Sequence, residues 1–107
     1  MPKYMIQASY TTEGIRGILK EGGSSRATTI EKMITGLGGR MESFYFAFGS
    51  DDVYVTADLP DNTTAASIGL TVTASGAVRT KTVVLLAPEE IDRATQQTIN
   101  YRAPGGQ

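Results

Sequence analysis

The segment Gly49-Ser50-Asp51-Asp52 places two adjacent carboxylates and a hydroxyl between two apolar runs. Adjacent carboxylates can bind a divalent cation or act as a general acid and base. Neighbouring side chains on a turn usually point apart, however, and no third ligand stands at a suitable spacing. We therefore interpret the segment as the tip of a hairpin, in which Gly49 permits a positive φ and Asp51 and Asp52 bind nearby backbone amides. We predict no metal site.

Two further groups could bind an anion. Glycines followed by hydroxyls and Arg26, in Gly22-Gly23-Ser24-Ser25-Arg26, could cradle an anion at the start of a helix. A kinked helix with a serine cap explains the same residues. Arg79 and Lys81 lie two apart in a predicted strand, hence on one side of it. They could form a solvated edge, bind an anionic ligand, or pair with carboxylates of a partner chain.

The chain has no cysteine and no histidine, which restricts its chemistry. Thiolate nucleophiles, disulfides, Ser-His-Asp catalysis and histidine-ligated metals are all excluded. Any acid or base would be a carboxylate, lysine or tyrosine whose pKa is moved by its surroundings. We predict no cofactor.

Length and charge indicate one domain in 107 residues with a net charge of −1. We assign residues 1–103 to the domain and 104–107 to a flexible tail. The scattered lysines and arginines argue against a nucleic-acid partner, since binding phosphates needs a concentrated basic face. No apolar run approaches the roughly 20 residues of a bilayer span. Because the first residues also lack the apolar stretch of a signal peptide, we expect a cytoplasmic protein without a membrane partner.

Hydrophobic periodicity predicts strands and helices in an alternating order. The expected elements are a strand at 3–10, a helix from Thr12 that is broken at Gly22-Gly23 and restarts with a cap at Ser24 or Ser25, strands at 40–48 and 53–59, a helix at 62–75, a strand at 78–87 and a helix from Pro88. A strand at 71–73 is the alternative to the helix at 62–75. The order is that of a ferredoxin-like α+β sandwich (βαββαβ) with an extra C-terminal helix and a four-stranded antiparallel sheet.

Polarity selects the register of the hairpin. Pairing Phe48 with Val53 places most apolar side chains on one face, whereas a slip of one residue would mix phenylalanines with aspartates. The predicted apolar face contains Phe44, Phe46, Phe48, Val53, Val55, Ala57 and Leu59. The predicted second face contains Ser43, Tyr45, Ala47, Tyr54, Thr56 and Asp58, and by alternation Met5, Gln7 and Ser9.

This second face is not covered by helices in such a fold. Tyrosines, a methionine and small residues resemble the composition of a subunit interface, although an ordinary solvated sheet face is the alternative. We predict that two sheets pack together in a homodimer or higher homo-oligomer and leave a small cavity between them. Tyr45, Tyr54, Ser9 and Arg79 are the candidate ligand-binding residues.

Several blocks of the sequence resemble the GYD-domain family of small bacterial proteins. They are PKYMIQASYTTEGIRGILKEGG, GLGGRMESFYFAFG, VYVTADLPDN and SGAVRTKTVVLLAPEEID, and the resemblance extends from Pro2 to about Pro104. It implies a fold of the dimeric α/β-barrel type and no mechanism, because the function of the family is unassigned. The Gly-Tyr-Asp-type turn of the family falls on residues 49–52, with Asp51 where the family usually places tyrosine.

The sequence therefore favours a homo-oligomeric domain that binds a small organic molecule between sheet layers. The alternative is a cofactor-independent enzyme, monooxygenase- or isomerase-like by analogy of fold alone, which uses tyrosine, carboxylate and arginine chemistry. A structural subunit of larger rings is a third hypothesis.

Overall fold

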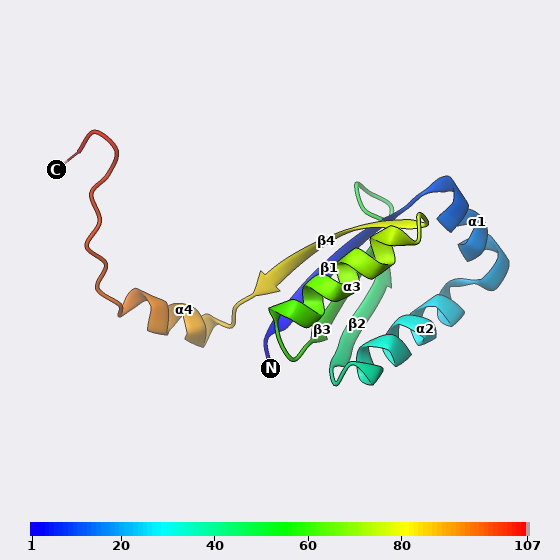
Figure 1. Ribbon diagram of the computed structural model, residues 1–107, viewed down its shortest axis with the longest axis horizontal. Helices are drawn as coiled ribbons and strands as arrows, with labels where there is room; N and C mark the ends of the chain where they lie inside the picture. The colour runs from blue at the N-terminus through cyan, green and yellow to red at the C-terminus, as the bar shows by residue number, and fades with distance from the viewer. Residues whose placement is uncertain (107) are drawn as a thin grey trace.

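The computed structural model describes residues 1–106, which form four strands and four helices (Figure 1). In chain order these are β1 (Lys3–Tyr10), α1 (Thr12–Glu21), α2 (Gly23–Gly36), β2 (Arg40–Phe46), β3 (Val53–Asp58), α3 (Asn62–Ala74), β4 (Val78–Leu85) and α4 (Pro88–Thr95). The strands form one antiparallel sheet in the order β2-β3-β1-β4. The predicted ferredoxin-like α+β architecture is confirmed. Gln107, at the end of the predicted tail, lies outside the described residues.

The core lies between one face of the sheet and the helices α2 and α3. Strand β1 is central, and its alternate residues Tyr4, Ile6 and Ala8 are buried. The remaining buried apolar residues come from β3, β4, the two helices and the β3–α3 connection, and they are Ile34, Val53, Val55, Ala57, Leu59, Ala65, Ile68 and Val78. None of the helices in residues 1–106 is long and apolar enough to cross a membrane.

Local signals set the helix boundaries. The predicted break between α1 and α2 occurs at Gly22, whose φ of 85° is a conformation that glycine adopts without a steric penalty. The predicted serine cap is wrong, because Gly22 itself precedes the first residue of α2. The helix at 62–75 is confirmed as α3, and its N-cap Asp61 accepts a hydrogen bond from the amide of Thr64 at 2.8 Å.

The β2–β3 hairpin has a different register from the predicted one. Phe46, rather than Phe48, pairs with Val53, and β2 ends at Phe46. The error is two residues, so the side chains within both strands stay on their predicted faces. Two predictions for Phe48 are wrong, its place in the strand and its place on the apolar face. It lies in the loop 47–52, and its side chain is fully exposed. The amide of Ala47 donates to the carbonyl of Asp52 at 2.8 Å and closes this loop.

The packing of Ile34 provides a test of the core. Ile34→Ala should lower the free energy of unfolding by about 2–5 kcal/mol, because its fully buried side chain leaves a cavity between α2 and the sheet. Urea denaturation followed by circular dichroism measures this change. Leu19→Ala on α1 is the control, since Leu19 is 81% exposed and its truncation should cost less than about 0.5 kcal/mol. Equal losses in the two variants would contradict this description of the core.

Candidate ligand site on the uncovered sheet face

The face of the sheet opposite α2 and α3 has no covering element among residues 1–106. The side chains that strand pairing places there include Met5, Gln7, Ser9, Ser43, Tyr45, Tyr54, Thr56, Arg79, Lys81 and Val83. Two of the predicted site residues, Tyr45 and Tyr54, stand directly opposite each other on β2 and β3. The other two, Ser9 and Arg79, stand opposite each other on β1 and β4. The fold thus brings the predicted residues together as two cross-strand pairs.

A network of paired charges occupies one end of this face. Lys3 Nζ lies 2.7 Å from Glu42 Oε2 and 3.0 Å from Asp58 Oδ1, and Arg40 Nη2 lies 3.0 Å from Asp58 Oδ2. The hydrogen bonds to Glu42 and Asp58 raise the pKa of Lys3. The bond from Lys3, with a smaller effect of Arg40, lowers the pKa of Asp58. These four charges pair with one another.

The opposite end of the face is organised around Asp51. This side chain is only 3% exposed, and its Oδ1 accepts a hydrogen bond from Ser9 Oγ at 3.0 Å. Its Oδ2 lies 3.2 Å from Lys81 Nζ. The bond from Lys81, supported by that from Ser9, holds the pKa of Asp51 below its ordinary value. Asp51 is therefore a carboxylate at neutral pH. It orients Ser9 and Lys81 and does not act as a proton donor.

The neighbouring Asp52 fixes the loop to β1. Its amide donates to the carbonyl of Ala8 at 2.8 Å, and its carboxylate accepts from the amide of Tyr10 at 2.9 Å. The two carboxylates thus serve different partners, and the loop is more than a free hairpin tip. The sequence predicted that Gly49 allows a positive φ in this turn. That prediction is wrong, because the glycines with positive φ within residues 1–106 do not include Gly49. The six-residue loop reverses the chain without the sharp bend that would need it.

A hollow of about 370 Å³ opens beside Asp51. Its lining residues are Ser9, Ser50, Asp51, Arg79, Thr80 and Lys81. The ion pairs of residues 1–106 include Lys81 but not Arg79, whose side chain is exposed. Since Asp51 balances Lys81, the hollow keeps one uncompensated positive charge, that of Arg79. It adjoins the tyrosine pair through Gln7, which stands between Tyr54 and Lys81.

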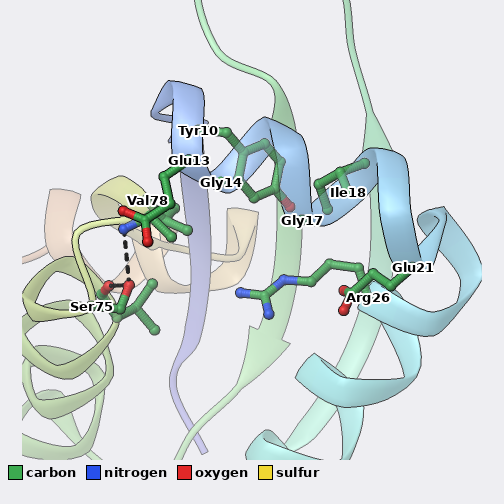
Figure 2. A pocket seen from close by; sticks show the side chains of 11 residues that line it. Tyr10, Glu13, Gly14, Gly17, Ile18, Glu21, Arg26, Ser75 and Val78 are labelled. Atoms are coloured by element: carbon green, nitrogen blue, oxygen red, sulfur yellow. Dashed lines mark hydrogen bonds between the residues drawn. The ribbon is translucent and has the colours of Figure 1, made fainter.

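A second hollow, of about 400 Å³, lies on the helical side of the molecule between α1, the start of α2 and the end of α3 (Figure 2). Figure 2 shows the ring of Tyr10 and the guanidinium of Arg26 facing the same space, with Glu13 and Glu21 at its border. Burial raises the pKa of Tyr10, while the charge of Arg26 opposes this rise. The sequence singled out Arg26 but not Tyr10, because their proximity arises only when α2 folds back toward the end of β1.

Metal chemistry finds no support in the described residues. Within residues 1–106 no group of three or more histidine, cysteine, aspartate or glutamate side chains could hold a metal ion. The adjacent Asp51 and Asp52 bind different partners, as described above. What the face offers a ligand is therefore hydrogen bonds, aromatic surface and the charge of Arg79.

Fold and surface together define a class of protein, a ferredoxin-like α+β domain with helices on one face of its sheet and an uncovered second face. Within that class, the chain belongs to the GYD domain family, whose model matches residues 4–95. No curated protein and no solved structure matches the chain. The match includes the loop 47–52 and hence Asp51.

The ion pair of Asp51 makes a testable contribution to stability. Asp51→Asn keeps an acceptor for Ser9 but loses the charge that attracts Lys81. Because the pKa of Asp51 is lowered from 3.8 on folding, the stability due to its charge is present above pH 3.8 and is lost as the pH falls through the folded pKa. The urea midpoints of the two proteins should therefore differ at pH 7 and converge at acidic pH.

The matched control for this prediction is Glu31→Gln on α2, which removes an exposed carboxylate outside the ion pairs of residues 1–106. Its urea midpoint should follow that of the unmodified protein at both pH values. If the deficit of Asp51→Asn stayed constant from pH 7 to pH 3, packing rather than charge would explain it.

Proposed function

We propose that this protein is a homo-oligomer whose uncovered sheet face forms a subunit interface and binds a small organic anion at its Arg79 end. The observation that carries this proposal is the position of the uncompensated Arg79 at the rim of an aromatic face. Neither feature is explained by the folding of a single copy, because both lie on the side of the sheet away from the core.

The composition of the face supports its burial against a second copy. Tyr45 is 71% exposed and Val83 is 44% exposed, and Met5 lies on the same face. Apolar and aromatic side chains gain about 25 cal/mol for each Å² of apolar surface removed from water. A two-fold axis over the face would repeat each contact, so a modest patch on one copy gives twice the contacts in a dimer.

The hollow beside Asp51 supports an anionic ligand. A guanidinium presents paired donors that match the two oxygens of a carboxylate, and such charge-assisted bonds are stronger than neutral ones. Asp51 keeps Lys81 and Ser9 fixed at the edge of the same hollow, which lowers the entropy lost on binding. Tyr54 stands next to Gln7 on the neighbouring strand and provides the nearest aromatic surface for the apolar part of the ligand.

The interface is tested with Tyr45→Glu. This change places a carboxylate, and in a symmetric dimer a pair of them, on the face at strand β2, so the variant should be monomeric where the unmodified protein is oligomeric. Multi-angle light scattering at tens of micromolar measures the mass, and circular dichroism checks the fold. Leu19→Glu, at an equally exposed position on α1, should leave the mass unchanged. A monomeric unmodified protein would refute this part of the proposal.

The ligand class is tested with benzoate and its uncharged isostere benzamide as probes. Benzoate should shift the amide resonances of Ser9, Tyr54 and Arg79 in titrations followed by nuclear magnetic resonance, and benzamide should shift them far less. Arg79→Gln should abolish the difference between the probes, because it removes the charge of the side chain and keeps a polar group that donates hydrogen bonds. Equal binding of both probes, or binding that survives Arg79→Gln, would contradict recognition by this residue.

The second candidate function is a cofactor-independent enzyme, and the hollow at Tyr10 is the observation that favours it. A neutral phenol beside a guanidinium can donate a hydrogen bond to a substrate oxygen, and the raised pKa of Tyr10 keeps the phenol in this neutral form. The same titration separates the two candidates. Benzoate-induced shifts confined to Tyr10, Arg26 and their neighbours would favour the helical hollow over the sheet face.

A further inference from the structure

Residues 86–106 form a C-terminal arm that leaves the body of the domain. Only Leu86 and Ala87 separate the end of β4 from α4, and every residue from 86 to 105 is exposed. Figure 1 shows α4 beyond the tip of β4, away from the sheet and the other helices. The molecule consequently measures 59 × 32 × 23 Å, with a radius of gyration of 17.3 Å. A compact chain of this length has a radius of about 13 Å.

The arm has the chemistry of a segment that packs against a surface. Leu86, Ile91, Ile99 and Tyr101 are between 46% and 72% exposed. In α4, Ile91 and Ala94 lie on one face of the helix, and the charged residues occupy other positions around it. A helix of eight residues has little stability by itself in water, so an ordered α4 needs a surface to cover its apolar face. The family match ends at residue 95 and therefore includes the whole of α4.

Helix α3 offers a complementary surface. Its thirteen residues include no charged side chain, whereas a helix on the surface of a monomer normally has a charged outer face. Ala66, Leu70 and Ala74 lie four residues apart on its outward side, and Leu70 is 74% exposed. A groove of about 630 Å³ runs between this side of α3 and the edge strand β4.

We propose that α4 of one copy packs into the α3 groove of a second copy, with Ile91 against Leu70. The arm of the same copy does not occupy this groove, because the extended Ala87 (φ −69°, ψ 153°) directs α4 away from α3. At 1.5 Å per residue, α4 is about 12 Å long and α3 about 20 Å, so one helix fits along the other. Every copy carries one arm and one groove, and exchange of identical segments is a low-cost route to assembly.

Charge does not oppose this docking. The groove contributes only alanine, glycine, leucine and threonine side chains. Glu89, Asp92 and Arg93 of α4 would remain on the side that faces water, and Glu90, at the border of the apolar face, accepts a hydrogen bond from the amide of Ala87 at 2.9 Å. This contact uses a surface separate from Tyr45 and Arg79, and its failure would therefore leave the proposed sheet interface untouched.

The absence of native cysteine allows a direct test by disulfide cross-linking. A disulfide forms only when two Cα atoms come within about 7 Å. The full chain with Leu70→Cys and Ile91→Cys should therefore oxidise to a covalent dimer on a non-reducing gel, and reductant should reverse it. The matched control pairs Leu70→Cys with Arg93→Cys, on the other side of α4, and should form the dimer several-fold more slowly.

The single variants distinguish the remaining arrangements. A covalent dimer of Ile91→Cys alone, as abundant as that of the double variant, would show that two arms pair with each other and would overturn the proposal. A disulfide within one chain, seen as a faster-migrating monomer, would overturn it as well, as would the absence of any specific cross-link. The double variant in the Tyr45→Glu background should still cross-link, because the arm contact does not require the sheet face.

Discussion

Alternation along the central strand β1 is the constraint on which the rest of the structure depends. Because successive side chains of a strand point to opposite faces, burying Tyr4, Ile6 and Ala8 in the core requires that Met5 and Ser9 lie on the other side. The chain supplies helices for the first face only. The two central strands place the uncharged Met5, Gln7, Tyr54 and Thr56 in the middle of the second face, and this gives the molecule a surface suited to association.

The loop 47–52 links this surface to the core. Asp52 binds the backbone at Ala8 and Tyr10, where β1 ends, and so the loop cannot move independently of the central strand. The adjacent Asp51 is thereby placed over Ser9 and Lys81. An uncharged side chain at this position could not balance the charge of Lys81. The aspartate of this chain thus leaves Arg79 as the single uncompensated charge in the hollow.

Local patterns in the sequence predict the elements well, since their causes are local. The alternation at 3–10 gives β1, and the cap at Asp61 with Ala65 and Ile68 at helical spacing gives α3. The hairpin register was wrong by two residues because a shift of two leaves every side chain on the same face. Only contacts between distant segments, such as Asp52 with β1, choose between such registers. The pairings of Asp51 with Lys81 and of Tyr10 with Arg26 depend on topology in the same way.

The two proposed contacts have different consequences for assembly size. A sheet-to-sheet contact about a two-fold axis closes on itself, so it produces a dimer and nothing larger. An arm that reaches the same partner adds to that dimer, whereas an arm that reaches a third copy joins dimers into a ring or an open chain. Strand β4 takes part in both contacts. Arg79 and Val83 of β4 lie on the uncovered face, and the arm starts directly after Leu85 at its end. A sheet contact that fixes β4 would also fix the direction in which the arm leaves, and that direction decides which copy it meets.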